Sequence, residues 1–294
     1  MRLSVLILGL FGLVTPAALG ADPGLTFFAW SDQHVTAEGD ASHVLPAVEA
    51  LNKLPGAPYP EKIGGTVPAP AFVFSCGDGT DAPTPAAVAA LDDAIAKRLK
   101  FPSFEIVGNH DETGAPPNDA VRKWVAARHG ATSYTFDRGG VHFVAPLATG
   151  NDAAGNLTET ISKEALDFIR ADLAKTPKGT PVVVAMHVGL GGIKNRDDVV
   201  RSFGDANVVL VLGGHFHKTA AGEFKGFRYL VLPSCKPEPE PQGEVVVVRI
   251  TADRLLALTW DYRAGKWSDD PKKTIDAAIK GPTTSAKPQV PGSK

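Results

Sequence analysis

Five segments of the chain place side chains suited to metal binding or acid–base chemistry directly after a run of apolar residues. In chain order the segments read DQH, GD, GNHD, H and GHFH, and they contain five of the eight histidines. Carboxylate, amide oxygen and imidazole groups are ligands that suit zinc, iron and manganese. Because the chain has only two cysteines, a structural zinc site is disfavoured and an open catalytic site is expected. The side chains concerned are Asp32, His34, Asp78, Asn109, His110, Asp111, His187, His215 and His217.

Each segment alone is weak evidence for a metal site. A Gly-Asp pair occurs by chance in most proteins, and an isolated histidine at the end of a strand is more often a hydrogen-bonded structural residue. The spacing of two residues in Asp32/His34 and in His215/His217 also fits one face of an extended segment. The occurrence of all five segments, each after an apolar strand, favours metal binding.

The elements that must position these residues are strands alternating with helices. Apolar runs predict strands that end just before the five segments, and helical spacing with capping residues predicts a helix in most of the intervals. This alternation is typical of a mostly parallel α/β sheet, in which ligands bind at the carboxyl ends of the strands. The predicted strands are 25–30, 71–75, 103–107, 181–186 and 207–212, and the predicted helices are 43–53, 85–99, 119–129, 162–175 and 197–203.

Further strands are predicted without helices between them. Residues 132–136 and 141–148 flank the sequence DRGG, which is typical of a hairpin turn. Three more strands, 227–233, 244–250 and 255–261, close the predicted domain and favour antiparallel pairing in a second sheet. The chain therefore predicts a mixed architecture.

The two ends of the chain have their own compositions. Residues 1–20 combine Arg2, an apolar run and small residues before Ala21, as in a secretory signal peptide, and the run is too short to favour a membrane anchor. We expect an exported protein whose domain spans 21–268, followed by a disordered tail at 269–294 that is poor in apolar residues. In an oxidising compartment Cys76 and Cys235 are either a disulfide or two buried thiols, and the sequence leaves both open.

The composition of the chain limits the classes of partner that the protein is expected to bind. The chain has 294 residues, 44% of them hydrophobic, which suits one large domain. The formal net charge of −2 provides no basic field, so nucleic acid and anionic membrane surfaces are not expected partners.

Taken together, the five segments resemble the signature of calcineurin-like metallophosphoesterases. SDQH, CGDG, GNHD, AMH and GGHFH match that family's D-x-H, G-D, G-N-H-[DE], H and G-H-x-H motifs in order, over residues 25–261. The resemblance implies an α/β fold, a four-layer α/β/β/α sandwich with two mixed sheets. It also implies two metal ions per chain at the sheet edge, drawn from iron, manganese and zinc.

The resemblance further implies a role for each residue. Asp32, His34, Asp78 and His217 would hold one ion, and Asp78, Asn109, His187 and His215 the other, with Asp78 bridging both. His110 would donate a proton to the leaving group and contact phosphate, while Asp111 would fix the orientation and tautomer of the His110 ring. The reaction implied is attack of a metal-activated hydroxide on phosphorus.

One position departs from a related branch. Purple acid phosphatases place a tyrosine three residues after the aspartate that matches Asp78, and this chain has Asp81 there. The sequence therefore resembles the plainer phosphodiesterase and phosphatase branch. We expect Asp81 to be either a hydrogen-bond partner near the site or the cap of the next helix.

The function expected is that of an exported phosphoesterase acting on a soluble, small-molecule phosphomonoester or phosphodiester. Two alternatives stay open: a metal-dependent binder of a phosphorylated ligand without turnover, and a nucleotidase or lipid phosphatase of the same superfamily. The presence of both His110 and Asp111 disfavours the binder, which needs no acid for a leaving group.

Overall fold

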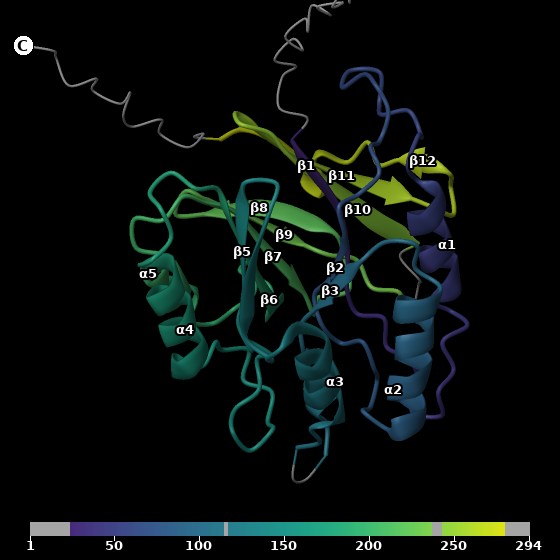
Figure 1. Ribbon diagram of the computed structural model, residues 1–294, viewed down its shortest axis with the longest axis vertical. Helices are drawn as coiled ribbons and strands as arrows, with labels where there is room; N and C mark the ends of the chain where they lie inside the picture. The colour runs from purple at the N-terminus through teal and green to yellow at the C-terminus, as the bar shows by residue number, and fades with distance from the viewer. Residues whose placement is uncertain (1–23, 115–116, 237–242, 280–294) are drawn as a thin grey trace, which may run out of the picture.

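The protein, described here from a computed structural model over residues 24–114, 117–236 and 243–279, is built on two mixed β-sheets that face each other (Figure 1). The first sheet has the strand order β12-β11-β10-β1-β2-β3, with β13 also paired to β11, and the second has the order β4-β5-β6-β7-β9-β8. The strands are β1 (Leu25–Trp30), β2 (Val73–Ser75), β3 (Ser103–Glu105), β4 (Tyr134–Arg138), β5 (Val141–Ala145), β6 (Val182–Val188), β7 (Val208–Gly214), β8 (Ala220–Phe224), β9 (Phe227–Val231), β10 (Glu244–Ile250), β11 (Arg254–Asp261), β12 (Lys266–Trp267) and β13 (Ile275–Ala278).

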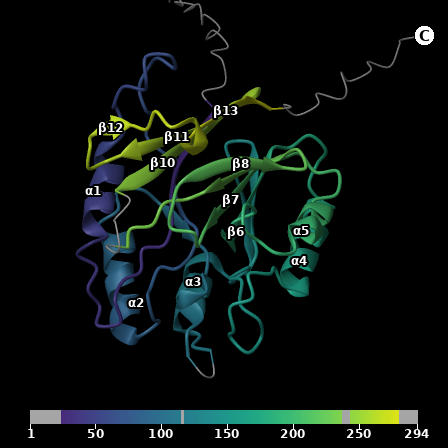
Figure 2. The ribbon, with the colours of Figure 1, turned by 180° about the vertical axis from the view of Figure 1, so that it is seen from behind.

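Helices cover the outer faces of the sheets. The first sheet carries α1 and α2, the second carries α4 and α5, and α3 packs at the end of the space between the sheets (Figures 1 and 2). This arrangement is the four-layer α/β/β/α sandwich that the sequence predicted. The helices are α1 (Leu45–Lys53), α2 (Pro85–Asp92), which continues as a π-helical turn over Asp93–Lys97, α3 (Ala120–His129), α4 (Lys163–Leu173) and α5 (Arg196–Ser202), with short 3-10 turns at His110–Glu112 and Pro271–Lys273.

Strand β1 shows why the first sheet is buried on both sides. Successive side chains of a strand point to opposite faces. Phe27 lies in the core between the sheets, whereas Phe28 and Trp30 lie in the core under α1 and α2. Because both faces are covered, the strand is a continuous apolar run that ends abruptly at polar Ser31 and Asp32.

The closing strands pair differently from the sequence prediction. Strands β10 and β11 do not form a second sheet of their own, because β10 pairs antiparallel with β1 and extends the first sheet. The second sheet is instead completed by β9, parallel to β7, and by β8, an edge strand that the sequence analysis missed. Strand β8 reads AAGEF, has no β-branched residue and is only partly buried, so its residues carry no clear period-2 signal.

The folded domain also extends beyond residue 268, where the predicted tail begins. Strand β13 pairs antiparallel with β11, and its Ile275 is buried in the core between the sheets. The predicted boundary is therefore too early, because one short strand with a single buried residue raises the apolar content of the tail very little. The predicted signal peptide and residues 280–294 lie outside the described residues.

The two cysteines are free and buried on opposite faces of the first sheet. Cys76 lies in the core between the sheets, and Cys235 lies in the core under α1 and α2. Of the two possibilities that the sequence left open, the structure has the buried thiols. Within the described ranges, no helix is both long and apolar enough to span a bilayer.

A surface histidine gives this domain a pH-dependent contact. His142 in β5 lies 2.8 Å from Asp137 Oδ1 and 2.7 Å from Asp172 Oδ2 of α4. Burial alone would lower the pKa of His142, but hydrogen bonds to Asp172 and Asp137 raise it above its ordinary value. The stabilising contact is therefore complete below about pH 6.5 and is lost as the pH rises through the raised pKa.

We expect His142→Gln to lower the free energy of unfolding by about 0.5–1 kcal/mol at about pH 5.5, and by less at about pH 9. Urea denaturation at the two pH values measures the difference. A loss that grows with increasing pH would contradict this assignment.

Candidate metal centre

The five polar segments meet where the carboxyl ends of strands from both sheets converge. Strands β1, β2 and β3 run parallel in the first sheet, and β6 and β7 run parallel in the second. Asp32, Asp78 and Asn109 follow the first three strands, His187 lies near the end of β6, and His215 follows β7. Residues more than 180 positions apart in the chain, such as Asp32 and His217, therefore come into contact.

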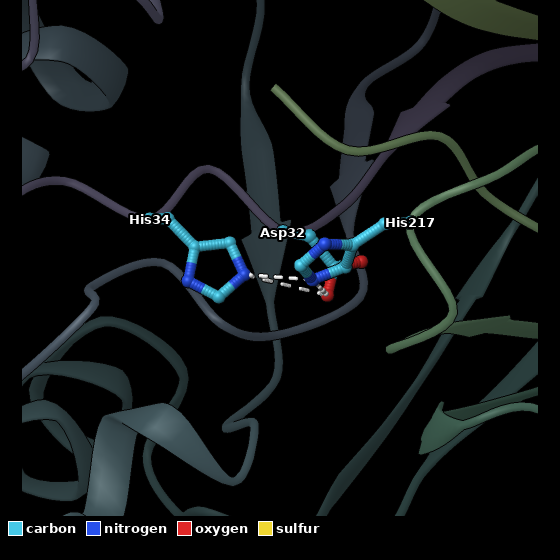
Figure 3. Close-up of side chains that lie close together, drawn as sticks. All are labelled: Asp32, His34 and His217. Carbon is cyan, nitrogen blue, oxygen red and sulfur yellow. Dashed lines mark hydrogen bonds and ion pairs between the residues drawn. The ribbon is translucent and has the colours of Figure 1, made fainter. Parts of the chain in front are cut away.

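The first group of side chains is Asp32, His34 and His217 (Figure 3). His34 Nε2 lies 3.0 Å from His217 Nε2 and 3.9 Å from Asp32 Oδ1, and His217 Nε2 lies 3.5 Å from the same oxygen. All three side chains thus direct a potential ligand atom at one point. Asp32 and His34 are buried, whereas the side chain of His217 is 36% exposed and borders the open side.

The second group is Asp78, Asn109, His187 and His215. Asn109 Oδ1 lies 2.9 Å from His187 Nε2 and 2.8 Å from His215 Nδ1, and His187 Nε2 lies 3.2 Å from Asp78 Oδ2. His187 is oriented by its other ring nitrogen, since Nδ1 lies 2.8 Å from the carbonyl oxygen of Cys76. That second contact leaves Nε2 as the ligand atom, as is usual for histidines that bind metals.

Asp78 lies between the two groups. Its Oδ1 accepts a hydrogen bond from the backbone N–H of His110 at 2.8 Å, while Oδ2 faces His187 Nε2 at 3.2 Å and His34 Nε2 at 3.8 Å. Oδ2 is completely buried, and it has no hydrogen-bond partner among the described residues. A buried carboxylate oxygen without a hydrogen bond is costly, and a cation on each side would satisfy it. The donor set therefore fits metal binding, with Asp78 placed between the two groups.

The backbone is unusual at the same positions. Asp32, His34, Asp78, His215 and His217 all have φ between +47° and +69°, a region that non-glycine residues rarely adopt. Only two other described residues that are not glycine do so, Glu159 and Lys225, and Lys225 lies in the β8–β9 turn. Strain of this kind collects at functional sites, where the surrounding fold enforces it.

Two motif glycines are required by close approach. A Cβ atom on Gly108 would lie 2.1 Å from Asp78 Oδ1, and one on Gly214 would lie 2.4 Å from Asp32 Oδ2. Neither Gly213 nor Gly214 has a positive φ, so their role is not to allow a left-handed turn. Gly214 instead leaves room for the Asp32 carboxylate, which accepts the backbone N–H of His215.

Comparison with solved structures places this geometry in a known fold. The chain is similar to a dimetal phosphatase from Danio rerio, with a TM-score of 0.58 and 13% sequence identity over 88% of this chain and all of that one. It is also similar to GAP50, described as the anchor in the inner membrane complex of Plasmodium, with a TM-score of 0.61 and 14% identity over 88% of this chain and 90% of that one. The chain has the calcineurin-like metallophosphoesterase fold. No family model and no curated protein matches the sequence.

The metallophosphoesterase fold brings all seven predicted ligands together, and His110 with them. His110 follows Asn109, its side chain is 36% exposed, and its ring lies against that of His34 with the ring centroids 4.8 Å apart. The predicted partner of His110 is wrong, however. Its Nδ1 lies 3.1 Å from the backbone oxygen of Asp81 and 3.6 Å from Asp81 Oδ1, not against Asp111.

Asp111 has a structural role instead. Its buried carboxylate accepts the backbone N–H groups of Gly79, Thr80 and Gly108 and the hydroxyl of Thr80, at 2.8–3.2 Å. Burial and the nearby Asp78 raise the pKa of Asp111 to about 6. Asp111 therefore links the loop after β2 to the loop after β3. It affects the site through the backbone hydrogen bonds that it accepts.

We expect Asp111→Ala to lower the free energy of unfolding of the metal-free protein by about 3 kcal/mol, because three backbone N–H groups lose their acceptor. Asp111→Asn keeps one oxygen and should lose less. Urea denaturation of both variants gives the comparison. An Asp111→Ala variant of normal stability with a specific loss of proton transfer would restore the original assignment.

Burial changes the pKa values of the histidines in the metal-free centre. It lowers the pKa of His34 to about 3 and that of His215 to about 4, so both rings are neutral near pH 7 with lone pairs available. Burial also lowers the pKa of His187, but Asp78 and Asp32 raise it more, to about 10. In the metal-free protein His187 therefore carries a proton, which an incoming cation must displace.

Sequence reasoning missed two residues at the rim. Lys236 Nζ lies 3.0 Å from Asp81 Oδ1, and Glu159 Oε1 lies 3.8 Å from His215 Nε2. Neither belongs to the five segments. The left-handed backbone of Glu159 has no signal in the sequence, because glutamate rarely adopts it. Of the two roles expected for Asp81, hydrogen bonding near the site is confirmed, since His34 Nδ1 lies 3.1 Å from Asp81 Oδ1 and the next helix is capped by Thr84.

The histidines outside the motifs make structural contacts. His43 lies in the turn before α1 and contacts the backbone oxygen of Gln33, while His129 at the end of α3 contacts buried Glu105. Neither these two histidines nor His142 on β5 belongs to the two ligand groups.

Proposed function

We propose that the protein is a phosphoesterase that uses two divalent metal ions, from among iron, manganese and zinc, to hydrolyse a soluble phosphomonoester or phosphodiester. The observation that carries the proposal is the Asp78 carboxylate. Its buried Oδ2 faces a histidine nitrogen of each ligand group and has no hydrogen bond in the described structure. As a further part of the proposal, the predicted signal peptide would place the reaction outside the cytoplasm.

The residues of the two ligand groups would have separate roles in this reaction. Asp32, His34, Asp78 and His217 would hold one ion, and Asp78, Asn109, His187 and His215 the other. Bound ions of this kind polarise a phosphoryl group and lower the pKa of water towards about 7. The side-chain amide of Asn109 keeps its N–H groups available for a phosphate oxygen, because its oxygen faces His187 and His215.

His110 supplies the proton that a leaving alkoxide needs. The backbone oxygen of Asp81 holds the Nδ1–H of the ring, so Nε2 is the nitrogen that delivers a proton to the leaving oxygen. The partly exposed ring lies beside His34 and thus at the edge of the first ligand group.

A metal-dependent binder without turnover is the competing function. One similar structure is described as an anchor and another as a dimetal phosphatase, so the fold alone is compatible with both functions. The contact between His110 and Asp81 favours hydrolysis, because a binder gains nothing from a positioned acid at the open side of the site.

The test uses purified protein without its first 20 residues, loaded with manganese, zinc or iron. We expect metal-dependent release of p-nitrophenol from p-nitrophenyl phosphate, from its bis ester, or from both. Metal content is measured on the same samples. Two bound ions with no turnover of either ester would overturn the proposal and favour the binder.

A further inference from the structure

Lys236 is fixed beside the first ligand group by hydrogen bonds to the backbone of a predicted ligand. The backbone oxygen of Asp32 accepts the N–H of Cys235 and the hydroxyl of Ser234, each at 3.0 Å. The hydroxyl oxygen of Ser234 in turn accepts the backbone N–H of Lys236 at 2.9 Å. The backbone from which the Lys236 side chain starts is therefore held in a defined place relative to Asp32.

The ammonium group points towards the residues of the open side. Lys236 Nζ lies 3.0 Å from Asp81 Oδ1, and the same oxygen lies 3.1 Å from His34 Nδ1 and 3.6 Å from His110 Nδ1. The carboxylate of Asp81 and the rings of His34 and His110 are close enough to hold a cation. The ammonium group of Lys236 already provides a positive charge at that carboxylate, which disfavours a further metal ion there.

This lysine also has capacity left for a ligand. An ammonium group has three N–H donors, and among the described residues Lys236 gives one of them to Asp81. Its side chain is 32% exposed, and that of the neighbouring His110 is 36% exposed. Because Lys236 Nζ and the His110 ring both lie beside Asp81 Oδ1, the ammonium group could reach an oxygen of a phosphoryl group bound next to His110.

We infer that Lys236 is a specificity-determining residue that selects phosphomonoesters over phosphodiesters. The inference rests on the proposed phosphoesterase function. A monoester carries a second negative charge on its phosphoryl oxygens, whereas a diester carries a second organic substituent in that place. A fixed cation beside the site stabilises the more highly charged substrate through a charge-assisted hydrogen bond that the diester cannot fully form.

The experiment compares the metal-loaded wild-type protein with Lys236→Gln, Lys236→Arg and a control, Lys225→Gln. Lys225 pairs with Asp197 at the β8–β9 turn, so the control removes the same charge at a different place. We expect Lys236→Gln to lower kcat/KM for p-nitrophenyl phosphate by about 10- to 100-fold and to change that for the bis ester by less than about threefold. Lys236→Arg should keep most of the monoester preference, because it keeps the charge.

Binding of inorganic phosphate to the same metal-loaded proteins, measured by calorimetry, needs no turnover. We expect about tenfold weaker binding to Lys236→Gln and unchanged binding to Lys225→Gln. Phosphate binding that depends on Lys236 in a protein that hydrolyses neither ester would refute the proposed hydrolysis while supporting the anion contact.

Three results would overturn the inference. Equal losses for the two esters would show that Lys236 acts through Asp81 on the whole site. Loss of metal from Lys236→Gln would show that it supports His34 and not the substrate. Unchanged monoester activity or phosphate affinity would show that the lysine contacts neither.

Discussion

Asp78→Asn should release metal from both ligand groups and lower kcat/KM by more than about 10²-fold, the upper end of what loss of an outer-shell partner costs. The amide can keep its oxygen at the position of Oδ1, where the backbone N–H of His110 donates. Its NH₂ group then points at His187 and His34, where a bridging anion is needed. Metal analysis after gel filtration measures the bound ions per chain.

The matched control is Asp40→Asn, a surface carboxylate outside the site. It should keep full metal content and activity. If Asp78→Asn retained two tightly bound ions, Asp78 would not be the bridge. The position of its carboxylate would then no longer support the proposed function.

His110→Ala should lower kcat by about 10²–10⁴, the range expected for loss of a general acid, and should leave metal content unchanged. The loss should depend on the leaving group. An alkyl phosphate needs a proton on its departing oxygen and should lose the most, while p-nitrophenyl phosphate, whose leaving group is more acidic, should lose less. Rates for the two esters, with metal content measured in parallel, give the comparison.

His129→Ala provides the control for removing an imidazole elsewhere, because His129 contacts Glu105 away from the ligand groups. Its kcat should be close to the wild-type value in the folded protein. An equal loss for both esters, or a loss of metal from His110→Ala, would contradict the assignment of His110 as the proton donor.

The convergence of the seven predicted ligands could be foreseen because each lies at or just after the end of a strand in the sequence. The apolar run of β1, for example, is followed by Asp32. Parallel strands bring their carboxyl ends to a common edge, so polar residues that follow different strands become neighbours in space. The alternation of strands with helices predicted a mixed α/β architecture, whereas the four-layer sandwich was expected only from the family resemblance.

Contacts made by solitary polar residues carried no such signal. Lys236 and Asp81 are 155 positions apart and meet near the point where a bridge between Ser31 and Ser234 joins distant segments. The family resemblance implied that Asp111 orients His110, yet its carboxylate accepts backbone N–H groups that no sequence pattern reveals. The pairing of β10 with β1 also could not be predicted, because an apolar strand does not specify which strand it pairs with.

The position of β1 between β2 and β10 has a consequence for biosynthesis. The first ligand-bearing strand is among the earliest described parts of the chain to be made, but its neighbour on one side begins only at Glu244. A ribosome that has completed GGHFH has translated every predicted ligand, yet Asp32 and His34 still lack the strand that supports them. Contacts over such separations form slowly. The surroundings of Asp32 and His34 can therefore be complete only after β10 has been made.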